Sequence, residues 1–231
     1  MLNLNNKWAL VTGASRGVGL RIAKALANEG CIVILHSRNL NNTRELLDEL
    51  HRDGKQAYAV AAELDTTEGI DNLIDDVRKL SNNCLDILYN NAAIMTPYRE
   101  IYQPSPDEYL KSFMVNIIAP AKLCDAFLPG MLERNWGRVV NLTSGIADQP
   151  QLMPYSCSKA ALDRYVRDMI PTLAGTNVLM NLLDPGWLRT DLGGDEAPNH
   201  PDSVIPGALV PVLLEQEAGS GGCYNAQAYS K

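Results

Sequence analysis

The sequence is poor in the residue types that bind metals or crosslink chains. Its 231 residues include three histidines, which lie far apart, and five scattered cysteines with no C-x-x-C pair. So few histidines do not predict a metal cluster, and an odd number of scattered cysteines predicts neither a zinc site nor a disulfide framework. We therefore expect no bound metal and a reducing, cytoplasmic compartment.

Positive charge and long apolar segments are also scarce. The 20 lysines and arginines are outnumbered by 27 aspartates and glutamates, which gives a net charge of −7. A chain of this charge is a poor match for nucleic acid or for an anionic membrane surface. The N-terminus, M-L-N-L-N-N-K, lacks the apolar core of a signal peptide. We also expect no apolar run long enough to span a membrane.

A regular alternation of short apolar runs and amphipathic segments runs through the chain. The apolar, β-branched runs predict strands and the segments between them predict helices. This order predicts one α/β domain over residues 1–231, a doubly wound parallel sheet between two helix layers, known as the Rossmann fold. The predicted strands are 8–12, 31–35, 56–64, 85–89, 137–142, 178–183 and 222–225. The predicted helices are 20–30, 42–53, 66–80, 107–128, 155–173 and 204–215.

A glycine-rich loop follows the first predicted strand, with the sequence T-G-A-S-R-G-V-G from Thr12 to Gly19. A strand, a glycine loop and a helix in this order place backbone N–H groups and a helix N-terminus against a phosphate. Glycine permits a close backbone approach that a β-carbon would block. The alternative is a plain tight turn between strand and helix. The loop is therefore a candidate phosphate site.

The end of the second predicted strand carries Ser37 and Arg38 and has no acidic residue. In dinucleotide folds an acid at this point favours NAD, whereas an arginine accommodates the 2′-phosphate of NADP. Arg16 in the glycine loop adds a second cation on the same side. The alternative is two solvated surface arginines, but the pattern favours NADP(H) over NAD(H).

The segment 139–162 carries a tyrosine, a lysine and a serine in an arrangement typical of proton transfer. Tyr155 and Lys159 are four residues apart, so on a helix they share one face. A phenol has a pKa of about 10, and a neighbouring ammonium is expected to lower it. Ser144, at the end of the preceding strand, is placed to hold a substrate oxygen against the phenol. The alternative is an exposed pair on an amphipathic helix.

Together these motifs resemble the classical short-chain dehydrogenase/reductase family over essentially the whole chain. The segment P-G-W-L-R-T-D-L-G-G, which starts at Pro185, is similar to the corresponding segment in the carbonyl-reductase-like branch of this family. The matching motifs are the glycine loop, Asp65, N-N-A-A at 90–93, Asn116, Ser144, Y-S-C-S-K at 155–159, and Pro185-Gly186 with Thr190. Each motif alone is weak, but their shared order is specific. The resemblance also implies a homodimer or homotetramer, built on the helices that start near Asp107 and Tyr155.

The resemblance further implies a role for each matching residue. Tyr155 would be the general acid or base, Lys159 would lower its pKa and bind the nicotinamide ribose, and Ser144 would hold the substrate oxygen. Asn116 would anchor a water in a proton relay. The residues expected to contact the cofactor are Gly13, Ser15, Arg16, Gly17, Val18, Gly19, Ser37, Arg38, Leu64, Asp65, Asn91, Ala92, Ala93, Tyr155, Lys159, Pro185, Gly186, Leu188 and Thr190.

Two features depart from the family pattern. Ala93 stands where the family usually has glycine, and the loop between Ser144 and Tyr155 is slightly shorter than is common. The short loop keeps Thr143 open as an alternative oxygen-holding residue, and it suggests a more open substrate entrance.

A substrate lid is expected around residues 187–214, where paired glycines follow the sixth strand. The lid side chains Met153, Trp187 and Leu192 suggest an apolar substrate face.

The leading hypothesis is an NADP(H)-dependent carbonyl reductase or alcohol dehydrogenase that acts on a small molecule. A cofactor-sensing or signalling protein on the same fold is the main alternative, because fold alone does not fix function. The intact Asn–Ser–Tyr–Lys set argues against that alternative. An epimerase or dehydratase is disfavoured by the short C-terminal part and by the glycine spacing.

Overall fold

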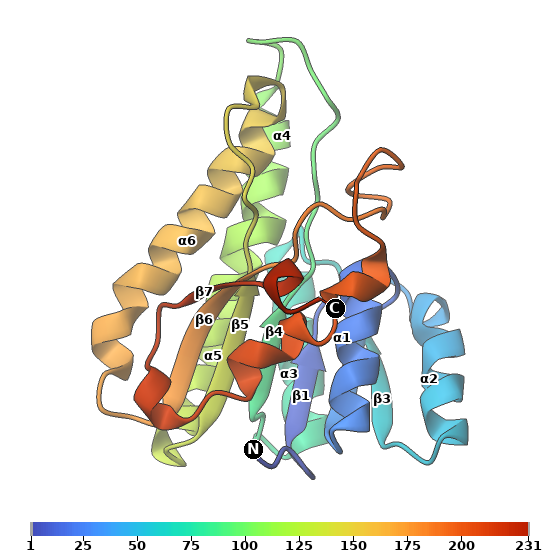
Figure 1. Ribbon diagram of the computed structural model, residues 1–231, viewed down its shortest axis with the longest axis vertical. Coiled ribbons are helices and arrows are strands. Elements are labelled where there is room, and N and C mark those ends of the chain that lie inside the picture. The colour runs from blue at the N-terminus through green and yellow to red at the C-terminus, as the bar shows by residue number, and fades with distance from the viewer. Residues whose placement is uncertain (1, 231) are drawn as a thin grey trace.

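A computed structural model describes residues 2–230 and confirms the predicted Rossmann fold (Figure 1). Seven strands form one parallel sheet in the order β3-β2-β1-β4-β5-β6-β7. The order reverses between β1 and β4, and ligands of such sheets bind at this switch point, beyond the carboxyl ends of the strands. The strands are β1 (Trp8–Val11), β2 (Ile32–Ser37), β3 (Ala57–Ala61), β4 (Ile87–Asn90), β5 (Gly137–Leu142), β6 (Val178–Asp184) and β7 (Cys223–Asn225).

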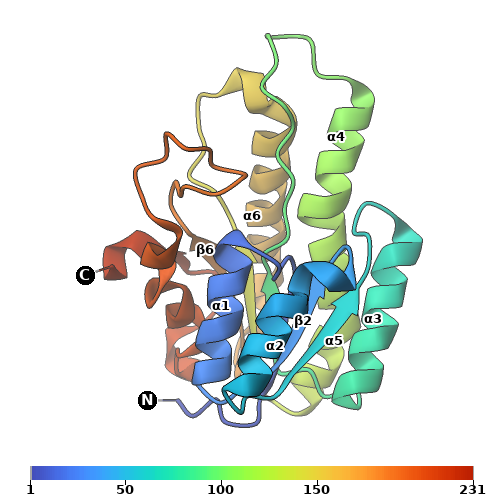
Figure 2. The same ribbon diagram turned by 90° about the vertical axis from the view of Figure 1, so that its right-hand side faces the viewer.

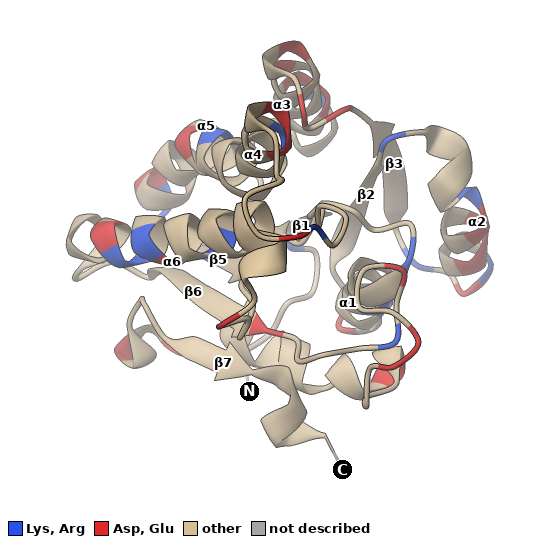
Figure 3. Ribbon diagram, turned by 90° about the horizontal axis from the view of Figure 1, so that it is seen from above, with Lys and Arg blue, Asp and Glu red and all other residues tan. Residues whose placement is uncertain are grey.

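Helices cover both faces of this sheet (Figures 1 and 2). The helices are α1 (Gly17–Asn28), α2 (Arg44–Arg52), α3 (Thr67–Ser81), α4 (Pro106–Phe113), α5 (Ala119–Glu133) and α6 (Met153–Leu173). Helices α1 and α2 pack with the C-terminal segment on one face, and α3, α5 and α6 pack on the other. Seen from the carboxyl end, most charged residues lie on the helices and connecting loops (Figure 3).

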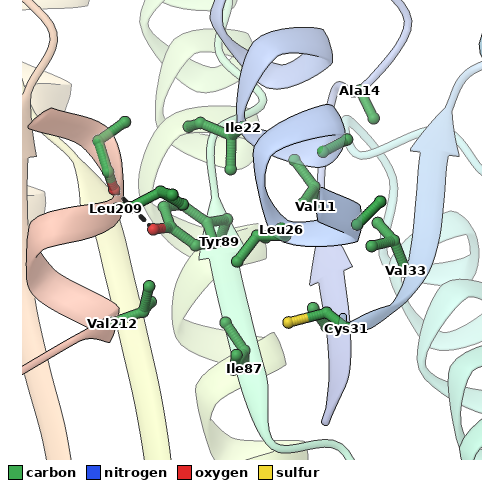
Figure 4. Close-up of a cluster of buried hydrophobic side chains, with 14 of the residues drawn as sticks. Val11, Ala14, Ile22, Leu26, Cys31, Val33, Ile87, Tyr89, Leu209 and Val212 are labelled. Atoms are coloured by element: carbon green, nitrogen blue, oxygen red, sulfur yellow. Dashed lines mark hydrogen bonds between the residues drawn. The ribbon is translucent and has the colours of Figure 1, made fainter. Parts of the chain in front are cut away.

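The strands are buried on both faces, so their alternate side chains enter two separate cores. In β1, Leu10 belongs to the core with α3, α5 and α6, whereas Val11 belongs to the core with α1. The second core is shown in Figure 4, where Val11, Ile22 and Tyr89 pack together. The Tyr89 hydroxyl donates a 2.7 Å hydrogen bond to the Ala208 carbonyl, which fixes the C-terminal segment on this face.

Three sequence expectations need correction. The helix predicted over 204–215 is absent; the structure has 3-10 turns at Pro201–Val204 and Gly207–Val212 instead. Pro206 and Pro211 lack the N–H that an α-helix needs. The helix predicted over 107–128 is interrupted by a π-helical stretch, Met114–Ile118. The helical run Pro106–Glu133 is long and apolar enough to cross a membrane, contrary to expectation. Half of its most apolar 18-residue stretch is buried inside the fold.

Candidate active site

A cavity of about 800 Å³ lies at the carboxyl edge of the sheet, over the switch point between β1 and β4. Its wall is built from the glycine loop, the ends of β2 and β4, the start of α6 and the segment after β6. All of these elements meet at one edge because every strand of the sheet is parallel. Among residues 2–230, no group of His, Cys, Asp and Glu is arranged to hold a metal ion.

The glycine loop has the geometry of a phosphate cradle. Gly13 and Gly17 have φ angles of +66° and +56°, in the left-handed region that favours glycine. A β-carbon at Gly19 would overlap the Gly13 carbonyl and the Asn91 amide. Glycine is therefore required for the close packing of the loop, and the N-terminus of α1 at Gly17 lines the cavity.

Side chains from the ends of the strands on either side of β1 hold this loop in place. The Asn91 amide donates to the carbonyls of Thr12 (2.7 Å) and Gly13 (3.2 Å). His36 accepts from the Gly13 N–H at Nδ1 (3.2 Å) and donates from Nε2 to the Ala62 carbonyl (3.1 Å). Burial lowers the pKa of His36 to about 4, so the ring is neutral at pH 7. His36 was missed in the sequence analysis because a lone histidine carries no motif.

The predicted adenosine end of the cavity is lined by charged side chains. Arg38 is exposed, lines the cavity and forms no ion pair within residues 2–230. Arg16 is paired with Asp191 of the segment after β6, at 2.5 Å. Asp65 is paired with Lys111 of α4, at 3.3 Å. Within residues 2–230, Arg38 therefore has no ion-pair partner, whereas Arg16 already has one.

Tyr155 and Lys159 lie side by side on the first turns of α6. Both are buried, with 5% and 4% of their surface exposed, and both line the cavity. The Lys159 ammonium donates a 2.7 Å hydrogen bond to the Leu142 carbonyl at the end of β5, and it lies 5.8 Å from the centroid of the Tyr155 ring. The half-buried Ser144 hydroxyl sits beside the Tyr155 phenol. The predicted serine, tyrosine and lysine therefore come together.

The pKa of Tyr155 shifts in the direction opposite to the sequence expectation. Burial raises it, the Ser144 hydroxyl acts to lower it, and the Asp184 carboxylate raises it further. Burial also lowers the pKa of Lys159 to about 8, against the opposing effect of Asp163. The expectation considered only the charge of the neighbouring ammonium, whereas desolvation of both groups dominates here.

Asn116 is buried in the π-helical stretch, and both polar atoms of its side chain are hydrogen-bonded. Its Oδ1 accepts from the Ile94 N–H, and its Nδ2 donates to the Ile94 carbonyl and to the Ser158 hydroxyl, each at 2.9 Å. Asn116 thus ties the strand end after β4 to α6. Both N–H groups of the amide are used, so a water held at this position would have to donate to Oδ1 or to the backbone carbonyl.

Thr143, the alternative to Ser144, lies at the end of β5. Its hydroxyl donates a short hydrogen bond to Asp163. The proton of Thr143 is therefore not available to a substrate oxygen, which leaves the Ser144 hydroxyl as the donor next to Tyr155.

Seventeen predicted residues line the cavity and four do not. Leu188 is buried in the core, Gly186 packs on Gln227, and Asn116 and Ser144 lie outside the cavity wall. Ala93 lines it without a positive φ angle, so its β-carbon causes no backbone strain. Thr143 and Leu192, expected as an alternative oxygen-holding residue and on the substrate face, also line the cavity. Cavity residues that the sequence analysis missed are Arg21, His36, Asn42, Glu63, Ile94, Lys111, Val115, Leu142, Arg189, Asp191 and Pro201.

Comparisons with known proteins agree with this geometry. The sequence profile of the short chain dehydrogenases matches residues 7–200. The uncharacterised oxidoreductase YvaG of Bacillus subtilis (strain 168) is 34% identical over 194 residues, covering 82% of this chain and 71% of its own. Dehydrogenase/reductase SDR family member 4 of Homo sapiens is 31% identical, covering 81% of this chain and 68% of its own.

Solved structures share the fold. A 3-oxoacyl (acyl-carrier-protein) reductase of Agrobacterium tumefaciens C58, with NADP bound, superposes with a TM-score of 0.86 at 27% identity, covering 96% of this chain and 93% of that one. The angucycline C-6 ketoreductase LanV, with bound NADP, superposes with a TM-score of 0.84 at 28% identity, covering 97% and 95%.

Proposed function

Since the chain belongs to the short-chain dehydrogenase family, we propose that it is an NADP(H)-dependent oxidoreductase that reduces a carbonyl group to an alcohol. The observation that carries this proposal is the convergence of Tyr155, Lys159 and Ser144 beside a cavity that begins at the glycine loop. Bound NADPH would supply the hydride, and the protein supplies the proton and the alignment of the reacting groups.

Tyr155 acts as the proton donor in this reaction. Because burial raises the pKa of its phenol, the hydroxyl stays protonated at neutral pH. The Ser144 hydroxyl holds the substrate oxygen beside it. With a pKa of about 8, Lys159 is mainly an ammonium at neutral pH and is placed to bind the hydroxyls of the nicotinamide ribose. A protonated phenol favours the direction of reduction.

NADP(H) is the preferred cofactor in this proposal. Arg38 lines the cavity with no ion-pair partner among the described residues, and β2 ends in Ser37 without an acid. An arginine fork matches the geometry of a phosphate, whereas an acid would repel it. Two of the solved structures with the same fold contain NADP.

The substrate we propose is a small ketone or aldehyde with an apolar substituent. Leu192 lines the cavity, and the exposed Met153 and Trp187 (38% and 57%) are each two residues in sequence from a lining residue, Tyr155 and Arg189 respectively. A carbonyl held at Tyr155 would then direct its substituent across these side chains.

A panel of aldehydes, ketones and quinones, with NADPH consumption as the readout, tests this function. The wild-type protein should oxidise NADPH with at least one class, and Tyr155→Phe should abolish turnover while NADPH still binds. Undiminished turnover by Tyr155→Phe would refute the assigned proton donor. A biological role that survives Tyr155→Phe would instead favour a cofactor-sensing protein.

We further propose a cytoplasmic homodimer or homotetramer. Leu110 of α4 and Ile118 of the π-helical stretch are exposed to 67% and 42% on the helices that the family uses for assembly. Light scattering after gel filtration tests the assembly, because a monomeric mass at micromolar concentration would exclude it. Cell fractionation tests the compartment.

A further inference from the structure

The face of α6 that carries Tyr155 and Lys159 continues to a third functional group. Asp163 follows Lys159 by four residues, so the three side chains stand one above the other on the helix. Asp163 is half-buried, and neither the cavity wall nor the family motifs quoted above include it.

Helix α6 is tied to the end of β5 at two successive positions. Lys159 donates to the Leu142 carbonyl at 2.7 Å, and the buried Thr143 hydroxyl donates to the Asp163 carboxylate. The next residue of the chain is Ser144. Asp163 therefore fixes the backbone from which Ser144 projects toward Tyr155.

Asp163 also lies one helical turn from Lys159 on the same face of α6, so its negative charge acts on the Lys159 ammonium. This ammonium is 4% exposed and has one hydrogen-bond acceptor in the described residues, Leu142. A buried charge with so little compensation is costly unless a counter-ion stands nearby. The negative charge of Asp163 favours the charged form of Lys159.

The other groups around Asp163 do not replace it in this role. Arg167, one turn further along α6, is exposed and forms no ion pair within residues 2–230. Cys223 of β7 lies near the carboxylates of Asp163 and Asp184, and burial and these charges raise the pKa of its thiol. The thiol is therefore neutral at pH 7, and Asp163 is the charged partner left to Lys159.

We propose that Asp163 is a positioning residue that keeps Lys159 as an ammonium and, through Thr143, fixes the strand end that presents Ser144. This proposal rests on the function proposed above, because it assigns Asp163 a part in the same reaction. In this role Asp163 acts on Lys159 and Ser144 without touching substrate or cofactor.

The affinity for NADPH as a function of pH tests the counter-ion role without any substrate. NADPH binding is measured by nicotinamide fluorescence over a range of pH. In the wild-type protein the affinity should fall above the pKa of Lys159, about 8, and we call the pH at which the fall begins the bend. Loss of a nearby carboxylate lowers the pKa of a cation, so Asp163→Asn should move this bend down by about one pH unit. An asparagine still accepts the Thr143 hydrogen bond, so this variant removes the charge and keeps the contact.

The matched control is Asp168→Asn. Asp168 is an exposed carboxylate on the same helix, paired with Arg164 at 2.8 Å, and its loss should leave the bend in place. An unshifted bend in Asp163→Asn, or an equal shift in both variants, would overturn the counter-ion role. If Asp163→Asn does not fold, Asp163→Glu replaces it. A bend at the wild-type pH in Asp163→Glu would support the need for a negative charge. Failure of both variants to fold would overturn the proposal, because it would show a role in stability alone.

The second variant, Thr143→Val, tests the contact with the strand end. It keeps the carboxylate and removes its hydrogen bond, so kcat should fall several-fold while the bend stays near its wild-type pH. An unchanged kcat would refute the positioning of Ser144. The bend is measured from cofactor binding, so it can be determined even if no carbonyl is reduced. Failure of this inference can therefore be distinguished from failure of the proposed reaction.

Discussion

The ion pair between Arg16 and Asp191 yields a quantitative prediction about cofactor choice. Arg16 is a predicted ligand of the 2′-phosphate, yet Asp191 already holds its guanidinium at 2.5 Å. NADPH must displace this carboxylate in order to use Arg16, whereas NADH, which has no 2′-phosphate, need not. Asp191→Asn should therefore tighten NADPH binding and leave NADH binding unchanged.

The size of the effect follows from the exposure of the pair. Both side chains are about two-thirds exposed, at 68% and 67%. Coulomb attraction at this distance in water is about 1.7 kcal/mol. Screening and side-chain entropy reduce measured values for exposed pairs to roughly 0.2–1 kcal/mol. NADPH should therefore bind Asp191→Asn up to about fivefold more tightly than wild type.

Fluorescence titration with both cofactors at low and high salt is the appropriate assay. The gain should shrink in 0.5 M salt, where the Debye length falls to a few ångströms, about half its value at 0.1 M. Asp202→Asn is the control, because it breaks the neighbouring ion pair with Arg21 (2.8 Å) and leaves Arg16 engaged. Equal tightening of NADPH and NADH, or a gain that persists in an Arg16→Ala background, would refute the reasoning.

Two further predictions concern the residues that shape the glycine loop. Gly19→Ala should weaken NADPH binding by about tenfold, because its β-carbon displaces the Gly13 carbonyl. The helical Gly130→Ala, whose β-carbon would meet the flexible end of Arg134 at 3.1 Å and the Asn83 carbonyl at an ordinary 3.7 Å, should bind like wild type. Burial lowers the pKa of His36 from 6.5 to about 4, so the unfolded chain binds more protons between these values, and acidification from pH 7 to 4.5 should cost about 2 kcal/mol of stability. Urea denaturation of wild type and His36→Gln at pH 7 and 4.5 checks this, and an equal loss in both would contradict it.

The sheet was predictable because its signal is local. The run I-V-I-L of β2 is apolar, as expected for a strand covered on both faces, and the polar residues His36 and Ser37 mark its end. The segment after β6 was not predictable in the same way. Its conformation between Trp187 and Pro206 depends on contacts with α1 and the C-terminal segment, such as the ion pair of Arg21 with Asp202.

Within the site, the sequence identified the residues that belong to motifs and missed those that support them. Tyr155 and Lys159 are recognisable from their spacing on one helix. His36 and Asp163 act through partners distant in sequence, at Gly13 and Thr143, and only the folded sheet brings these together. The same holds for Asp191, which the sequence places in a lid and the structure places on Arg16.

The order in which Tyr155 and Lys159 lose their protons does not follow from their charges alone. A lysine beside a tyrosine suggests a phenolate paired with an ammonium, the state suited to taking a proton from an alcohol. Burial instead raises the pKa of the phenol and lowers that of the ammonium to about 8, so Lys159 is deprotonated before Tyr155 as the pH rises. The free protein at neutral pH therefore holds a phenol beside an ammonium. This state can give a proton to a carbonyl oxygen, which is the step that the proposed reduction requires.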